Sequence, residues 1–186
     1  MTTNMTPPPE VPGDDRDWTF VIDQGCTECG FQPFPPNQMG DRLRSAAERW
    51  RPVLERAGAT QRPEEQTWSP VEYACHVRDM ITVLQQRVEA MLSQRNPDLE
   101  DLEGDAEAVR RGYWRADSQT VLAELTQNAQ LTADLMDTVE GQQWELPGRR
   151  SDGFEFTIAT LCLYIGHEME HHLYDVNGCG RCSNRL

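Results

Sequence analysis

The chain has 186 residues, which is enough for one domain with its own core. It carries 17 Lys and Arg against 31 Asp and Glu, a formal net charge of −14 at pH 7, and so acidic a surface disfavours nucleic-acid and anionic-membrane partners. The sequence lacks an apolar run of the roughly 18 residues that a membrane helix needs, and its N-terminus lacks the features of a signal peptide, so we expect a cytoplasmic protein.

Two short extensions flank the predicted domain. Residues 1–16 are rich in Pro and acidic residues and are expected to form a disordered arm. Residues 17–38 contain a short apolar patch, the motif Cys26-Thr-Glu-Cys29-Gly30 and a Pro-rich linker. Residues 178–186 form a tail with the matching spacing Cys179-Gly-Arg-Cys182.

Residues 39–177 contain apolar side chains mainly at helical spacing. The first predicted helix covers residues 39–57, includes Pro52 and ends before a glycine. The second begins sharply, because Ser69 is a typical N-cap, a proline follows it, and Glu72 completes a capping box.

A short helix is predicted around residues 106–115, and a third long helix over residues 118–140. Turn signals then indicate a hairpin-like excursion before the last helix, residues 157–176. Four long amphipathic segments predict an all-α fold, a four-helix bundle with Cys-rich terminal extensions. The linker between the second and third helices is long enough for a crossover.

Three of the four histidines lie in one six-residue stretch of the last predicted helix, residues 167–172. The fourth, His76, lies on the second predicted helix. Two pairs at i and i+4 are available, His167 with His171 and Glu168 with His172. Either pair can share one metal ion with His76 from the facing helix. On a helical wheel, Glu168 and His172 lie at the edge of the apolar stripe and are preferred, while the other pair remains an alternative.

The cysteine spacing suggests a second metal site. Each Cys-x-x-Cys motif is half of a four-cysteine zinc centre. If the two ends of the domain meet, one structural zinc on Cys26, Cys29, Cys179 and Cys182 would hold both extensions to the bundle. Redox disulfides and unrelated free thiols are the other two interpretations. The remaining cysteines, Cys75 and Cys162, are expected to be core residues.

Three motifs together resemble the DinB superfamily over about residues 39–177. They are Trp68-Ser-Pro-Val-Glu-Tyr-Ala-Cys-His76, His-Glu-x-x-His-His-Leu-Tyr-Asp175, and Gly-Arg-Arg-Ser-Asp-Gly before the last helix. The resemblance implies a four-helix bundle with one divalent metal, often zinc or nickel, held by His76, Glu168 and His172. A branch of the family with three histidine ligands would suggest His167 and His171 instead.

The family includes mycothiol-dependent maleylpyruvate isomerase and other thiol-dependent transferases. The resemblance therefore implies a low-molecular-weight thiol, such as mycothiol or bacillithiol, activated at the metal to attack an electrophilic substrate. Arg149 and Arg150 are candidates for binding that thiol, unless they are ordinary surface arginines. Hydrolysis by a metal-bound hydroxide and a non-catalytic metal sensor or binding module are alternatives, and a homodimer is possible because similar proteins often dimerise.

Overall fold

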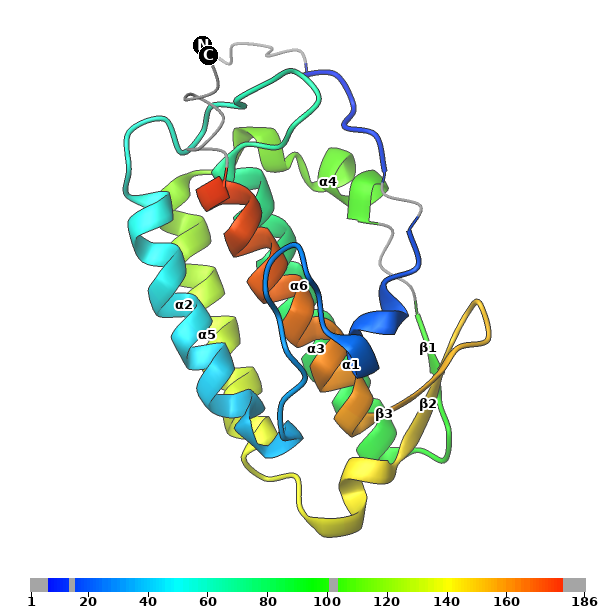
Figure 1. Ribbon diagram of the computed structural model, residues 1–186. Coiled ribbons are helices and arrows are strands. Elements are labelled where there is room, and N and C mark those ends of the chain that lie inside the picture. The colour runs from blue at the N-terminus through cyan, green and yellow to red at the C-terminus, as the bar shows by residue number, and fades with distance from the viewer. Residues whose placement is uncertain (1–6, 14–15, 101–103, 179–186) are drawn as a thin grey trace.

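The computed structural model describes residues 7–13, 16–100 and 104–178. Four long helices pack side by side as a bundle (Figure 1), which confirms the predicted all-α fold. They are α2 (Met39–Leu54), α3 (Pro70–Ser93), α5 (Ser118–Met136) and α6 (Ile158–Gly178). Within the described ranges, none of the helices is long and apolar enough to cross a membrane.

The helices follow a crossover order. Both α2 and α3 pack against α5 and α6, so these two consecutive helices lie mostly across the bundle from each other. The connection from α3 to α5 contains α4 (Gly104–Arg111) and a single 3-10 turn, Tyr113–Arg115, close to the predicted short helix. As a result, α3 and α6 become neighbours although more than 60 residues of chain separate them.

The start of α3 is fixed as the sequence predicts. The Ser69 side chain accepts a hydrogen bond from the Glu72 backbone N–H, and the Glu72 carboxylate accepts one from the Ser69 N–H, which completes the capping box. The same carboxylate is buried and pairs with Arg62, with Nη2 and Oε1 2.5 Å apart. These contacts fix the residue at which α3 begins and therefore the directions in which its following side chains point.

A three-stranded sheet lies beside the bundle. Strands β2 (Pro147–Arg150) and β3 (Glu155–Thr157) pair antiparallel and form the predicted hairpin. Strand β1 (Asp98–Leu99) pairs with β2 in parallel and was not predicted. The third long helix ends at Met136 instead of residue 140, and a 3-10 helix at Gly141–Glu145 follows.

The N-terminal segment, defined here as residues 16–38, lies against α6 (Figure 1). It contains a 3-10 turn (Trp18–Phe20) and α1 (Val21–Gln24). Phe34 packs so closely on Gly166 of α6 that a Cβ there would lie 2.8 Å from the Phe34 ring. Residues 7–13, part of the predicted arm, are also placed against the bundle, where Arg62 donates a hydrogen bond to the Pro9 carbonyl.

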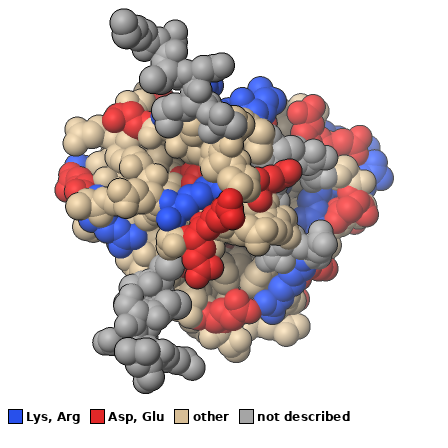
Figure 2. Space-filling model, turned by 90° about the horizontal axis from the view of Figure 1, so that it is seen from above, with Lys and Arg blue, Asp and Glu red and all other residues tan. Residues whose placement is uncertain are grey.

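Charged side chains of opposite sign lie beside each other on the face shown in Figure 2. A network of charged side chains also reaches the interior at Asp79 of α3, which is buried. Its carboxylate pairs with Arg78 and Arg111 and accepts a hydrogen bond of 2.5 Å from the Tyr113 hydroxyl. This network attaches the connection between α3 and α5 to the bundle.

Replacing Tyr113 by phenylalanine is expected to destabilise the fold by about 1–3 kcal/mol, because the buried carboxylate of Asp79 loses a donor. Urea unfolding followed by circular dichroism measures this free energy. Tyr174→Phe is the control, since Tyr174 is exposed on α6 and its substitution is expected to change stability little. Equal stability of the two variants would contradict the prediction.

Candidate metal centre

His76 lies on α3, almost two turns after the capped N-terminus, and is buried. Its ring packs against the Trp68 indole, with ring centroids 5.6 Å apart, and edge-on against the His172 ring at 4.9 Å. The capping box and these ring contacts hold the imidazole in one position. It therefore faces α6 without needing a flexible loop to present it.

Glu168 and His172 face His76 from adjacent turns of α6. The Glu168 Oε2 atom lies 3.5 Å from His76 Nε2 and 3.4 Å from His172 Nε2. We call these three residues the bundle cluster. One candidate ligand atom from each lies within 4.8 Å of the others, as the preferred helical-wheel interpretation requires.

The distances within the bundle cluster fit a metal site better than hydrogen bonds. Hydrogen bonds between N and O atoms are typically about 2.7–3.2 Å long. Two N or O ligands that share a zinc ion at tetrahedral angles lie about 3.3–3.5 Å apart, given bonds of about 2.0–2.2 Å. The two distances to Glu168 Oε2 match the second geometry. A donor set of two imidazoles and one carboxylate suits a divalent ion of the zinc or nickel type.

Asp175 supports the bundle cluster from outside it. Its Oδ2 accepts a hydrogen bond of 2.9 Å from His172 Nδ1, which leaves Nε2 to face Glu168. Metal-binding histidines commonly have such a carboxylate on the second nitrogen. Within the described chain, the buried Nδ1 of His76 has no hydrogen-bond partner, so the ring is held by packing and by the contact of its Nε2 with Glu168.

The electrostatics of the bundle cluster stabilise its charged forms. Burial disfavours ionisation of Glu168, but the neighbouring His167, His172 and His76 hold its pKa well below the ordinary value. Burial also lowers the pKa of His172, but Asp175 and Glu168 outweigh this and raise it to about 9. In the metal-free protein, Glu168 and His172 therefore form an ion pair. A divalent cation would take the place of the proton on His172.

The other predicted pair on α6, His167 and His171, faces the N-terminal segment. These histidines meet Cys26 and Cys29 there, and one candidate ligand atom from each of the four lies within 4.8 Å of the others. We call this group the knuckle cluster. From the sequence, the cysteines and these histidines are assigned to two separate sites and are not combined. The predicted partners Cys179 and Cys182 lie outside the described residues, and Cys75 and Cys162 are buried in helices as expected.

The two thiols of the knuckle cluster have different acidities. Burial raises the pKa of Cys26, but backbone N–H groups of the turn and His167 outweigh this, so the pKa is lowered. Burial and the neighbouring Cys26 raise the pKa of Cys29 to about 11. Burial lowers the pKa of His171, and the pKa of His167 is raised because Glu168 and Cys26 outweigh its burial.

The two arginines predicted to bind a thiol lie in the hairpin and point to different places. Arg150 pairs with Asp152, with Nη2 and Oδ2 2.6 Å apart, and its guanidinium lies 5.7 Å from the centre of the Tyr164 ring. Tyr164 lies one turn before Glu168 on α6. Arg149 instead pairs with Asp98 on β1.

A cavity of about 260 Å³ is lined by residues that contact the bundle cluster, and not by the cluster's own three residues. Tyr73, whose ring packs 5.2 Å from the His172 ring, lines it together with Trp68 and Asp175. Arg56 and Gln61 supply further polar groups. Tyr73 is a residue of the site that is not predicted from the sequence. Tyr73 lies three residues before His76 on α3, and residues at this spacing share a face of the helix, which is the signal in the sequence.

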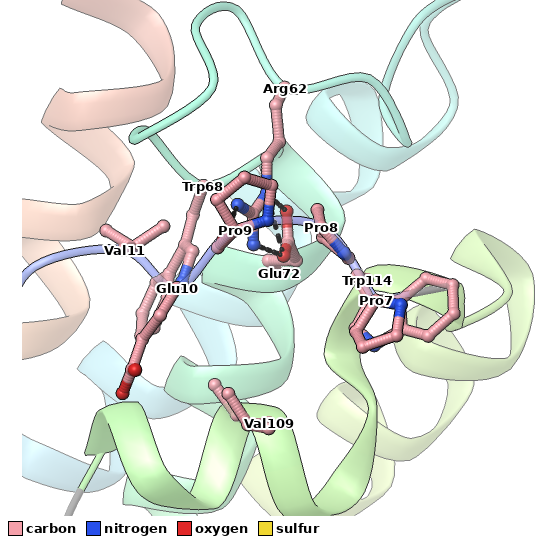
Figure 3. A pocket seen from close by; sticks show the side chains of 11 residues that line it. Pro7, Pro8, Pro9, Glu10, Val11, Arg62, Trp68, Glu72, Val109 and Trp114 are labelled. Carbon is pink, nitrogen blue, oxygen red and sulfur yellow. Dashed lines mark hydrogen bonds and ion pairs between the residues drawn. The ribbon is translucent and has the colours of Figure 1, made fainter. Parts of the chain in front are cut away.

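A second, smaller pocket lies on the other side of Trp68. Figure 3 shows Pro7 to Val11 lying across the side chains of Trp68 and Arg62, with Arg62 pointing at Glu72. The N-terminal residues therefore cover the outer face of the Trp68 indole. The same indole also packs against the His76 ring. Trp68 separates this pocket from the bundle cluster.

The sequence matches the family model of the DinB superfamily over residues 38–176, which covers α2, α3, α5 and α6 up to Val176. The chain belongs to the DinB superfamily. Among solved structures, this DinB protein resembles YfiT from Bacillus subtilis with a TM-score of 0.72 and 17% identity, over 81% of this chain and 89% of YfiT. YfiT is described as a probable metal-dependent hydrolase with an unusual four-helix bundle topology. No curated protein matches the sequence significantly.

Replacing Asp175 by asparagine is expected to weaken metal binding at the bundle cluster by about 10–100-fold, because His172 loses the carboxylate that orients it. Competition against a chelator of known affinity measures the change. Glu170→Gln is the matched control, since Glu170 lies on the same helix and pairs with Arg49 at the surface. Equal losses in the two variants would show an effect of helix charge rather than of His172 orientation.

Proposed function

We propose that this DinB protein is a metal-dependent enzyme that transfers a low-molecular-weight thiol to an electrophile or uses that thiol for isomerisation. The observation that carries the proposal is a set of three candidate ligands, His76, Glu168 and His172, whose aromatic and carboxylate neighbours line a cavity. Three protein ligands leave a coordination position open, as in catalytic sites, whereas structural sites use four. A divalent metal bound there would lower the pKa of a coordinated thiol or water to near neutrality.

The protein's own residues have three tasks in this proposal. Asp175 accepts the hydrogen bond from His172 Nδ1 and so keeps Nε2 directed at the site. The rings of Trp68 and Tyr73 limit access of water to His76 and His172. Arg56 and Gln61 line the cavity with donors for the hydroxyl or carboxylate groups of a bulky thiol.

Arg150 is the better placed of the two arginine candidates for thiol binding. It contacts α6 through Tyr164, whereas Arg149 faces β1. In the transfer itself, the thiol loses its proton to solvent and its sulfur bonds to the electrophilic carbon. The leaving group departs with the bonding electron pair, so no external oxidant or reductant is needed.

Hydrolysis is the second candidate, with water in place of the thiol at the same residues. It is favoured by the description of YfiT, whose fold this chain shares. The two candidates differ in the nucleophile and not in the ligand set. A test must therefore offer both nucleophiles to the same preparation.

The test compares the zinc- and nickel-loaded wild type with His76→Ala. Loss of mycothiol or bacillithiol with a chloro-dinitroaromatic acceptor reports transfer, and release of nitrophenol from an ester reports hydrolysis. Thiol-dependent turnover that disappears in His76→Ala is the expected result. Ester hydrolysis without thiol consumption would replace the proposal by the second candidate. Inactivity in both assays with metal bound would favour a sensor or binding module.

A further inference from the structure

The turn that carries Cys26 and Cys29 is fixed by its own backbone. Gly25 and Gly30 both adopt the left-handed region, with φ of 69° and 79°. The Cys26 N–H donates to the Phe31 carbonyl, and the Gly30 N–H donates to the Cys26 carbonyl, each at 2.9 Å. Side chains at Gly25 have no room, since a Cβ there would lie 2.4 Å from the Phe31 carbonyl oxygen. The turn therefore presents both thiols on one side.

The opposite side of the cluster is formed by α6. His167 and His171 are one turn apart, and Trp18 of the N-terminal segment packs on both rings, with centroids 5.0 and 4.9 Å away. His167 is only 1% exposed, yet neither of its ring nitrogens has a hydrogen-bond partner among the described residues. Buried polar atoms normally have a hydrogen-bond partner. A buried His167 nitrogen that lacks one and lies beside two thiols therefore indicates a bound ligand.

The distances have the size of a metal site. Cys26 Sγ lies 3.7 Å from His171 Nδ1. A thiolate and an imidazole that share a tetrahedral zinc ion lie about 3.6 Å apart, given bonds of about 2.3 and 2.0–2.1 Å. Two cysteines and two histidines are a common ligand set of structural zinc and complete its four positions.

We propose that Cys26, Cys29, His167 and His171 bind a structural zinc ion that attaches the N-terminal segment to α6. The four protein ligands close the coordination sphere, so this ion has no position for substrate. A segment of so few residues has little core of its own, and zinc binding contributes directly to the free energy of docking it. The site shares no ligand with the bundle cluster, so this proposal does not depend on the proposed function and can be tested separately.

Two other arrangements make different predictions. A disulfide between Cys26 and Cys29 would leave the buried His167 without a hydrogen-bond partner among the described residues, with only the Glu168 carboxylate 3.8 Å from its Nδ1. The zinc site gives both the ring and the thiols a partner. A zinc ion shared by Cys26, Cys29, Cys179 and Cys182 would leave both His167 and His171 without a ligand role. Substitutions on α6 and in the C-terminal tail therefore separate the three arrangements.

The experiment replaces zinc by cobalt in the full chain. Cobalt bound to thiolates gives a sulfur-to-metal charge-transfer band, which the bundle cluster cannot produce because it contains no sulfur. We expect this band in the wild type and in His76→Ala, and its loss in Cys29→Ala and His171→Ala. Elemental analysis should show the loss of one zinc ion in these two variants. Cys162→Ala, which removes a buried thiol elsewhere, is the matched control and should keep the band.

Two results would overturn the proposal. One is a band that survives His171→Ala but disappears in the double variant Cys179→Ser/Cys182→Ser, which would assign the zinc to four cysteines. The other is a wild type without zinc and without a cobalt band after reduction and reconstitution. If Cys29→Ala does not fold, the wild type still decides the question, because zinc should protect two thiols from alkylation and the N-terminal segment from proteolysis.

Discussion

Replacing Glu168 by glutamine is expected to lower metal affinity at the bundle cluster by more than about 100-fold, beyond the range seen when only an outer partner of a ligand is removed. Glutamine keeps the shape of the side chain but removes the negative charge. Glu168 Oε2 is the one oxygen that faces both His76 and His172, so its charge is central to holding a cation. Calorimetric titration of the metal-free protein with zinc or nickel measures the affinity.

Glu170→Gln, two residues further along α6, removes the same charge at the surface and is expected to leave the affinity within a few-fold of wild type. The cobalt–sulfur band of the knuckle cluster should persist in Glu168→Gln. An unchanged affinity at the bundle cluster would remove Glu168 from the ligand set.

Replacing Glu72 by alanine is expected to destabilise the fold by about 3–5 kcal/mol, since it breaks a buried ion pair and the cap of α3 together. Arg62 is left mostly buried without its carboxylate partner, and the Ser69 N–H loses its acceptor. Chemical unfolding gives the free energy. Glu89→Ala on the exposed side of the same helix is the control and should cost less than about 1 kcal/mol.

The Glu72 contribution should also depend on pH. Burial raises its pKa, but Arg62 and Ser69 outweigh this, and the folded-state pKa lies below the ordinary value of 4.5. The stabilisation is therefore complete above pH 4.5 and is lost as the pH falls through the lower folded-state pKa. The stability difference between the wild type and Glu72→Ala should shrink in that acidic range. A difference that stays constant on acidification would show that charge is not its source.

The features that could be predicted from the sequence are those that depend on residues close together in the chain. The cap at Ser69, the four helices and the hairpin each follow from local spacing and were found. Strand β1 was missed because two residues carry no periodic signal and its partner β2 lies about 50 residues away. The end of α5 was placed too late because apolar spacing continues to Val139, which is buried after the helix has ended.

The candidate sites show the same division. A helical wheel gives directions around α6, so it could identify two ligand rows and rank them. It could not show that the N-terminal segment covers the second row, because that contact joins residues 145 positions apart, such as Cys26 and His171. Both residue pairs of the knuckle cluster are visible in the sequence, but there the two histidines form only the alternative pair for the bundle metal.

The two candidate ligand rows lie on one helix, α6, so the directions in which they face are coupled. Positions 167 and 171 face one partner and positions 168 and 172 another, on one continuous helix that begins at Ile158. Inserting or deleting one residue after Ile158 and before these positions would rotate both rows by about 100° and turn each away from its partner. We therefore expect both rows to be more sensitive to a change in the length of this stretch than to the exchange of one of its partly exposed residues.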